Sequence, residues 1–275
     1  MNLSASEIRT LYKTISDEYN TTPLAVVEGW YHQPTEPGFL ELQAVIKSLP
    51  ENGVFIDIGT GKGIAPRLIK RLGARTISVD SLAAAGRSAI ENVKLAGVEG
   101  YFCDVSRERI PVEDGIADCV LFADVIEHLL HSPKPVLQEI FRVLKPGGVC
   151  VATTPNSMRL TVRARVLAGY SNWHDLDDFF DHDFHAGHHH EYTIDEFKRV
   201  FEKTNFEIGE FILYEDSLRT VSIEGVGDIK TQDRSRTTKK AEPLVARFGK
   251  KMLLAVTELF PRFRSNMLLV AHKRA

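Results

Sequence analysis

Short apolar runs alternate with segments of helical periodicity through the middle of the chain. The runs are bounded by Gly, Pro, Asn or Asp, and they have the length and continuity of strands buried in a parallel sheet. They are Val54–Ile58, Arg75–Val79, Gly100–Asp104, Asp118–Phe122 and Val149–Thr153. Because helical segments separate the runs, the pattern predicts an α/β fold in which right-handed crossovers connect parallel strands.

Further elements flank this alternating region on both sides. Two helical repeats precede it, and we expect the first to pack over the mouth of a cofactor or substrate site. After it, Thr193 and Glu196 have the spacing of a capping box, which predicts a helix that begins at Ile194. The flanking elements are helices over Ser4–Asn20, Gly38–Leu49 and Ile194–Lys203 and strands over Phe206–Tyr214 and Ser265–Ala271.

A glycine-rich turn, Gly59-Thr60-Gly61-Lys62-Gly63, leaves the first strand. Glycines let the backbone approach a ligand closely, so the turn is predicted to bind a cofactor. A dinucleotide fingerprint requires a third glycine where Ile64 stands, which disfavours NAD. A loop for nucleoside triphosphates requires Ser or Thr directly after Gly-Lys, where Gly63 stands, which disfavours ATP.

Two acidic residues follow the next strands. Asp80 closes the second strand about twenty residues after the glycine turn, where a carboxylate can accept hydrogen bonds from both ribose hydroxyls of a nucleoside. Asp104 closes the third strand. Alternatively, Asp104 is only a solvent-exposed acid that caps the strand.

The glycine turn, the two strand-end acids and the turn at Leu144–Gly148 before the fifth strand together resemble the class I S-adenosylmethionine-dependent methyltransferases. The resemblance covers roughly residues 53 to 155, with looser support to residue 214. It implies a Rossmann-like, doubly wound, seven-stranded and mostly parallel sheet whose last strand is antiparallel and lies beside the fifth. It also implies S-adenosyl-L-methionine as the cofactor. The residues implied to bind it are Asp57, Gly59, Gly61, Gly63, Asp80, Phe102 and Asp104.

Three candidate catalytic residues, Asp124, Glu127 and His128, follow the fourth strand, where the resemblance places the methyl group. Helical spacing puts the three on neighbouring sides of one turn. Methyl transfer is a direct displacement, so the protein mainly has to align a nucleophile and, for a hydroxyl, remove its proton. Carboxylates and a histidine beside the methyl group suit that task.

More histidines follow the fifth strand, in the run from His182 to Thr193. Carboxylates combined with histidines can hold a divalent metal such as Mg²⁺ or Mn²⁺. The pattern is similar to that of ubiquinone-biosynthesis O-methyltransferases and of small-RNA 3′-terminal 2′-O-methyltransferases, and it implies Glu127, His128 and His188 as ligands. Asp124 stands where the RNA group has a longer Glu. Metal binding, a metal-free role of His128 as a base and a structural role all remain open.

Composition and charge agree with a globular cytoplasmic protein. The chain is 43% hydrophobic and 26% charged, with a formal net charge of −3, and it has no apolar run of the roughly eighteen residues that a membrane span requires. Its first residues lack the profile of a secretory signal. Cys103, Cys119 and Cys150 lie at predicted strands, which favours buried thiols in a reducing compartment.

Charge is segregated along the chain. Residues 227–275 contain twelve Lys or Arg and four Asp or Glu, while the rest of the chain is acidic. A helical stretch within residues 239–264 has a broad apolar side flanked by Lys and Arg, and we expect that side to pack on the sheet. The alternative is peripheral contact with an anionic membrane. Residues 228–238 are expected to form a mobile connector.

The expected organisation is an N-terminal helical cap over residues 1–50, a methyltransferase core over 51–215 with a substrate insertion at 156–191, and a basic connector, amphipathic helix and last strand over 216–275. The leading hypothesis is an enzyme that methylates a hydroxyl of a small molecule or a sugar. Alternatives are an RNA 2′-O-methyltransferase with a metal-assisted site, a small-molecule N-methyltransferase and a noncatalytic S-adenosylmethionine-binding regulator. The overall acidity disfavours a nucleic-acid partner.

Overall fold

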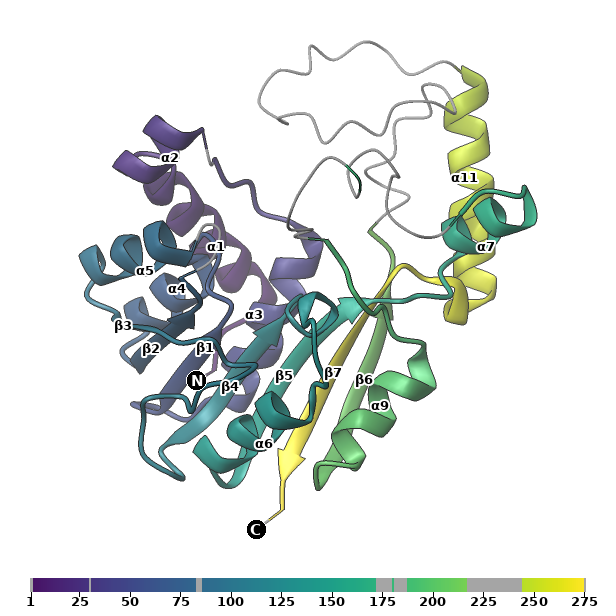
Figure 1. Ribbon diagram of the computed structural model, residues 1–275. Coiled ribbons are helices and arrows are strands. Elements are labelled where there is room, and N and C mark those ends of the chain that lie inside the picture. Colours follow the sequence, from purple (N-terminus) through teal and green to yellow (C-terminus); the bar gives the residue numbers. More distant parts are fainter. Residues whose placement is uncertain are drawn as a thin grey trace.

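The chain forms a single seven-stranded sheet in the order β3-β2-β1-β4-β5-β7-β6 (Figure 1). The computed structural model describes residues 2–29, 31–82, 86–171, 180, 187–216 and 244–274. The strands are β1 Val54–Ile58, β2 Arg75–Asp80, β3 Glu99–Phe102, β4 Ala117–Ala123, β5 Leu144–Pro155, β6 Phe206–Tyr214 and β7 Asn266–Lys273.

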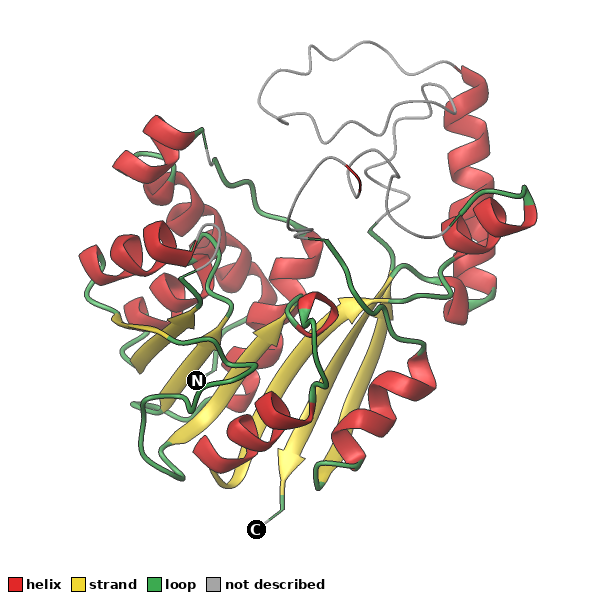
Figure 2. Cartoon of the chain, viewed as in Figure 1, coloured by secondary structure: helices red, strands yellow, loops and turns green. Residues whose placement is uncertain are grey.

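Helices cover both faces of the sheet (Figure 2). The α-helices are α1 Ala5–Tyr19, α2 Pro23–Glu28, α3 Glu36–Ser48, α4 Ile64–Arg71, α5 Gly86–Leu95, α6 Lys134–Val143, α7 Leu160–Leu167, α9 Ile194–Glu202 and α11 Leu244–Leu259. Two short 3₁₀ helices are η1 Ile126–His128 and η3 Pro261–Phe263. No described helix is both long enough and apolar enough to cross a membrane.

Strands β1 to β5 run parallel to their neighbours, whereas β7 is antiparallel to both β5 and β6. This confirms the predicted Rossmann-like sheet with its antiparallel last strand beside the fifth. The predicted turn at Leu144–Gly148 falls inside β5. Leu144 pairs with Ala117 and the next paired residue, Val149, pairs with Cys119, so the residues between them bulge out of the pairing with β4. Gly147, with φ of 77°, bends the chain inside the strand.

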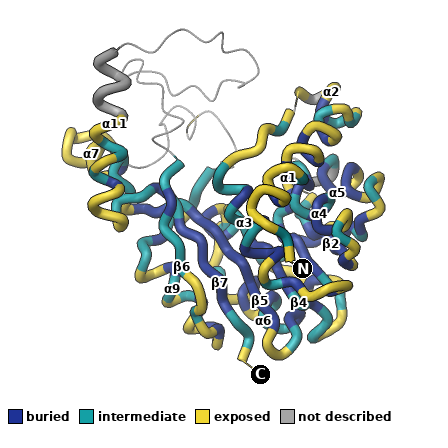
Figure 3. Tube along the Cα trace, turned by 180° about the vertical axis from the view of Figure 1, so that it is seen from behind, coloured by how far each residue is buried: buried dark blue, intermediate teal, exposed yellow. Residues whose placement is uncertain are grey.

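Successive residues of the inner strands alternate between two hydrophobic cores, one on each face. In β1, Phe55 belongs to the core beneath α1, α3 and α4, while Ile56 and Ile58 belong to the core beneath α6 and α9. The strands are accordingly the most buried part of the chain (Figure 3). Because side chains alternate along a strand, Asp57 points to the same face as Phe55.

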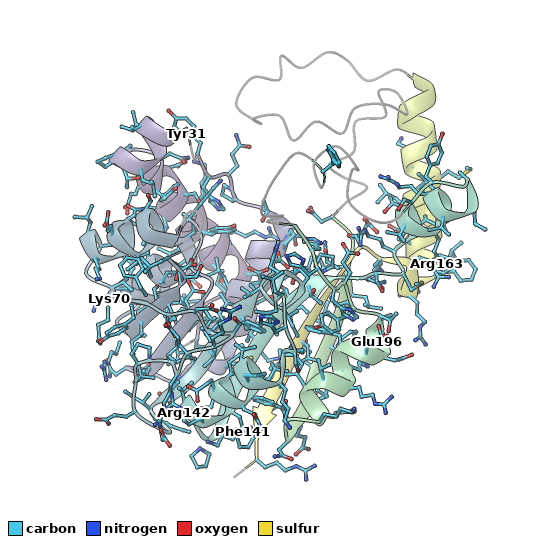
Figure 4. The ribbon with its side chains drawn as sticks, in the orientation of Figure 1. Tyr31, Lys70, Phe141, Arg142, Arg163 and Glu196 are labelled. Atoms are coloured by element: carbon cyan, nitrogen blue, oxygen red, sulfur yellow. The ribbon has the colours of Figure 1, made fainter. Side chains whose placement is uncertain are left out.

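The N-terminal helices pack into the core that contains Phe55. α1 packs against α3 and α4, and its buried side consists of Ile8, Tyr12, Ile15, Ser16 and Tyr19. The segment after α2 contacts the glycine-rich turn, because Lys62 Nζ donates a hydrogen bond to the carbonyl oxygen of Tyr31 (Figure 4). The connection between α2 and α3 therefore borders the predicted cofactor loop.

Asn156 fastens the end of β5 to the segment before β7. Its side-chain amide donates to the carbonyl oxygens of Arg262 (3.0 Å) and Arg264 (2.9 Å), and its backbone N–H donates to the carbonyl oxygen of Ser265 (2.8 Å). Asn156 is fully buried, so these bonds satisfy groups that water cannot reach. They hold η3 against the edge of the sheet where β5 ends.

The outer elements agree only partly with the predictions from the sequence. The capping box of Thr193 and Glu196 is confirmed at the start of α9, and the helix at Leu244–Leu259 is confirmed as α11. The expectation that the apolar side of α11 packs on the sheet was wrong for Met252 and Leu259, which are 60% and 75% exposed. The predicted connector at 228–238 and the histidines at 182 and 185 lie outside the described residues.

Candidate functional site

The carboxyl ends of the parallel strands bring the predicted site residues to one edge of the sheet. Ile58 of β1 lies opposite Val79 of β2 and Phe122 of β4. Gly59 follows β1, Asp80 is the last residue of β2 and Asp124 follows the last residue of β4, so the three lie near one another at this end of the sheet. This edge is where ligands bind in open α/β sheets.

The three glycines of the turn have positive φ angles but different surroundings. A Cβ at Gly59 would lie 2.3 Å from Val125 Cγ2, and one at Gly63 would lie 2.2 Å from Val93 Cγ1. A Cβ at Gly61 would have no neighbour closer than the Gly59 carbonyl oxygen at 4.0 Å. Packing therefore requires Gly59 and Gly63, whereas Gly61 faces open space that a ligand can fill.

Two carboxyl groups lie beside this turn. Asp80 accepts hydrogen bonds from the backbone N–H groups of Gly61 (3.2 Å) and Ser81 (2.8 Å). Burial raises the pKa of Asp80, and these bonds oppose the rise. Burial, with the neighbouring charge of Asp80, also raises the pKa of Asp57 to about 7.

The acid after the third strand has a local role. β3 ends at Phe102, so Asp104 lies in the turn beyond the strand. Its Oδ1 accepts hydrogen bonds from the backbone N–H (3.0 Å) and hydroxyl (2.6 Å) of Ser106. Phe102 is exposed, and Lys94 Nζ lies 5.7 Å from the centre of its ring. Cofactor binding by Phe102 and Asp104 stays a prediction.

Asp124 is not part of a helical turn, which corrects the expectation from sequence spacing. It has a φ of 50° and precedes η1, and it is not part of the group formed by Glu127, His128 and His188. The Thr153 hydroxyl lies 3.1 Å from Asp124 Oδ1 and 3.2 Å from Glu41 Oε1. The Asp124 side chain is exposed at its surface, yet desolvation by the protein around it raises its pKa.

Glu41 of α3 was not predicted as a site residue. Burial, then the charge of Asp124, raises the pKa of Glu41 to about 8, although the Thr153 hydroxyl opposes the rise. Glu41 is therefore mostly protonated at neutral pH, and a protonated Glu41 can share the Thr153 hydroxyl with an ionised Asp124. No local sequence signal marks Glu41, because its partner lies 112 residues away.

Glu127, His128 and His188 lie close together, as predicted. Their ligand atoms all lie within 4.8 Å of one another, and the two imidazole rings meet edge to face with centres 4.8 Å apart. Glu127 is 0% exposed, and Thr154 Oγ1 donates to its Oε2 at 3.0 Å. Its Oε1 is buried without a hydrogen-bond partner among the described residues. Burial, then the charge of Asp124, raises the pKa of Glu127 to about 7.

A second carboxylate orients His188. Glu191 Oε1 lies 2.8 Å from His188 Nδ1, and Arg159 forms two hydrogen bonds with the same carboxylate. Burial would raise the pKa of Glu191, but the hydrogen bonds from His188 and Arg159 lower it to about 2. The bond to Glu191 raises the pKa of His188 and fixes the orientation of its ring.

The backbone of the histidine run is bound to η1. The N–H groups of His189 (2.7 Å) and His190 (3.2 Å) both donate to the carbonyl oxygen of Glu127, and His128 Nδ1 lies 3.1 Å from the Gly187 carbonyl oxygen. The three consecutive histidines therefore differ in role, since only His188 joins the group with Glu127 and His128.

The site residues fit the cofactor that the resemblance implies. The open space at Gly61 allows a ligand to approach the backbone, and the adjacent Asp80 carboxylate can accept hydrogen bonds from ribose hydroxyls. The group of Glu127, His128 and His188 has the oxygen and nitrogen donors of a divalent-metal site.

Comparisons with known proteins agree with these features. The family model described as "Methyltransferase domain" matches residues 36–210. Dimethylglycine N-methyltransferase of Parasynechococcus marenigrum is 36% identical over 110 residues, 39% of this chain and 39% of that protein. The mitochondrial ubiquinone biosynthesis O-methyltransferase of Mus musculus is 32% identical over 117 residues, 38% of this chain and 30% of that protein. The matches thus span less than half the length of these curated relatives.

The fold also matches solved structures. The crystal structure of a SAM dependent methyltransferase from Archaeoglobus fulgidus aligns with a TM-score of 0.56 at 16% identity. The alignment covers 92% of this chain and 100% of that one. At this identity the likeness supports the fold alone.

Gly61→Ala should weaken binding of S-adenosylmethionine at least about tenfold, because a methyl group would enter the space that the ligand needs. Gly73→Ala is the matched control, since Gly73 also has a positive φ and an open surrounding but lies in the turn after α4. Both variants place Ala at a positive φ. Calorimetric titration of each variant measures the difference, and equal affinities would contradict the assignment of the turn.

Glu41→Gln should stabilise the protein at high pH. The folded-state pKa of Glu41 is about 8, whereas the unfolded value is about 4.3. Between these values the folded state binds a proton that the unfolded chain releases, so stability falls as the pH rises. At pH 9 we expect a Tm at least about 2 °C above wild type, and at pH 4 no gain. Exposed Glu51→Gln serves as control, and a gain that does not depend on pH would contradict this account.

Proposed function

Because the chain belongs to the methyltransferase-domain family and is a class I S-adenosylmethionine-dependent methyltransferase, we propose that it methylates a hydroxyl group of a small molecule or a sugar. The observation that carries this proposal is the group of Glu127, His128 and His188 at the end of β4. A buried carboxylate and two imidazoles can receive a hydroxyl and its proton at the edge where the cofactor binds.

The cofactor side of the site consists of the glycine turn and Asp80. Because Gly61 has no side chain, a ligand can approach the backbone there. Asp80 is held by hydrogen bonds from two backbone N–H groups, and in this proposal it accepts hydrogen bonds from the ribose. Bonds to a charged acceptor are the stronger kind. When bound, S-adenosylmethionine supplies an electrophilic methyl group, so the remaining task of the protein is to align the acceptor and manage its proton.

The acceptor side supplies groups that can take a proton near neutral pH. Glu127 has a pKa of about 7, and one of its oxygens has no hydrogen-bond partner among the described residues. His128 is exposed beside it. Glu191 fixes the ring of His188, so His188 is a positioned donor or acceptor rather than a mobile side chain.

We extend the proposal to a divalent metal held by Glu127, His128 and His188. Such an ion would supply positive charge that favours the ionised form of a hydroxyl acceptor, in place of proton acceptance by these three side chains. Glu191 would then form the carboxylate–histidine pair that commonly orients a metal-binding imidazole. Asp124 lies outside this group, beside Thr153 and Glu41.

A second candidate function is methylation of an amine. The carboxyl groups of Glu41, Asp57, Asp124 and Glu127 gather at the same edge of the sheet, and their charges raise one another's pKa values. An acidic site attracts a protonated amine and can accept the proton that the amine must lose before methyl transfer. Dimethylglycine N-methyltransferase is one of the relatives.

The net charge of −3 does not favour an RNA acceptor. The three cysteines are free and buried, which supports our proposal that the protein works in a reducing compartment such as the cytoplasm.

The experiment is a radiolabel assay with matched acceptor pairs that differ only in a hydroxyl or an amine. We expect label from S-adenosylmethionine in the hydroxyl member, with little in the amine member. Glu191→Gln should lower kcat about tenfold, the size expected when a residue that orients a ligand side chain is changed. Its affinity for the cofactor should stay unchanged, because Glu191 does not touch the glycine turn.

Two controls sharpen this assay. Exposed Glu202→Gln on α9 should leave kcat unaltered. A chelator should suppress transfer, and Mg²⁺ or Mn²⁺ should restore it. Label in the amine member alone would favour the second candidate, and full activity with the chelator present would remove the metal from the proposal.

A further inference from the structure

α7, η3 and the C-terminal end of α11 gather at one corner of the molecule (Figures 1 and 3). The two amide bonds from Asn156 to the carbonyl oxygens of Arg262 and Arg264 hold η3 at the end of β5. The guanidinium of Arg163 on α7 lies 4.8 Å from the ring centre of Phe263, which joins α7 to η3 (Figure 4). These elements form one corner surface, made of residues 159–170 and 251–264.

The corner surface exposes large apolar side chains. Leu167 on α7 is 89% exposed, the highest value among the exposed large apolar residues of the described chain. The exposed apolar residues of this surface are Val166, Leu167, Tyr170, Met252, Leu259 and Phe260. Single exposed apolar residues are ordinary, but a group of them on adjoining elements marks an interaction site.

The outer side of α11 carries large apolar residues beside Lys251 and Glu258. Leu253, Leu254 and Val256 are partly buried, whereas Met252, Ala255 and Leu259, at helical spacing, are exposed. A surface helix of a globular protein normally has polar residues on its outer side. The outer side of α11 therefore combines apolar surface with charge, as a helix at a membrane interface does.

The same surface carries concentrated positive charge. Residues 159–170 and 251–264, which make up the corner surface, contain six Lys or Arg and one acidic residue, Glu258, although the whole chain has a net charge of −3. Arg163, Arg165 and Lys251 are exposed. Arg262 forms an ion pair with Asp195 at 3.0 Å. The remainder of the protein is accordingly acidic, which would orient the molecule with this corner toward a negative surface.

We propose that the corner surface docks onto an anionic phospholipid bilayer. Apolar side chains enter the boundary between head groups and acyl chains, and Lys and Arg pair with anionic head groups. This combination matches the exposed Leu167, Met252 and Leu259 and the cations beside them. An acidic protein partner would account for the cations but not for the exposed apolar side chains around them.

Docking here would place the candidate active site next to the bilayer. β5 ends and β7 begins at this corner, with Pro155 opposite Asn266, at the same sheet edge as Asp80 and Glu127. An acceptor with a lipid tail could then reach the site without leaving the membrane surface. The docking itself depends only on the corner surface and stands whichever acceptor is methylated.

The test is sedimentation of the full-length chain with vesicles. Wild type should sediment with vesicles that contain phosphatidylglycerol and much less with pure phosphatidylcholine, and high salt should release it. Leu167→Asp combined with Leu259→Asp should reduce binding at least tenfold. The control is Leu95→Asp, an 81% exposed leucine on α5 at another part of the surface.

Folding of each variant is checked by thermal unfolding and by cofactor affinity, both of which should match wild type. If the double variant does not fold, Arg165→Glu with Lys251→Glu serves as the second test and should abolish the preference for phosphatidylglycerol. Failure of wild type to bind the anionic vesicles would overturn the proposal, as would an equal loss in Leu95→Asp. A dimer that the Leu167 and Leu259 changes dissociate would also overturn it, because a second copy would then cover the surface.

Discussion

In-register pairing of parallel strands organises the whole site. Ile58 pairs with Val79 and Phe122, so the glycine turn, Asp80 and the segment from Asp124 emerge together. The backbone N–H of Gly59 donates to the carbonyl oxygen of Val79 at 2.9 Å, and that of Asp124 donates to Thr153 at 3.1 Å, which extends the pairing beyond the strands. A slip of one residue would turn Asp57 to the opposite face and separate Asp80 from the turn.

This convergence gathers acidic groups in a confined space. Glu41, Asp57 and Glu127 have pKa values of about 8, 7 and 7, since burial and mutual repulsion disfavour their ionised forms. The protein limits the repulsion with backbone N–H groups at Asp80 and hydroxyls at Thr153 and Thr154. Carboxyl groups that gain or lose protons near neutral pH suit a reaction in which an acceptor gives up a proton.

Local pattern predicted most of the fold but only part of the site. The strands and the capping box at Thr193 follow from periodicity and spacing, and the grouping of Glu127, His128 and His188 followed from a motif. Glu41 and Arg159 could not be found in this way, because each acts through a partner far along the chain. The side of α11 that faces solvent was also mispredicted, since the sequence of an apolar helix side does not show whether a sheet or another surface covers it.

The central claim is that Asp80 binds the ribose of the cofactor. It is tested most directly by titrating wild type and Asp80→Asn with S-adenosylhomocysteine and with its 2′-deoxy analogue. The account predicts that wild type binds the deoxy analogue roughly 10- to 100-fold more weakly, as expected for the loss of a charged hydrogen bond. In Asp80→Asn the two ligands should bind with nearly equal affinity. An equal loss in both proteins would contradict the assignment of Asp80 and the position of the cofactor built on it.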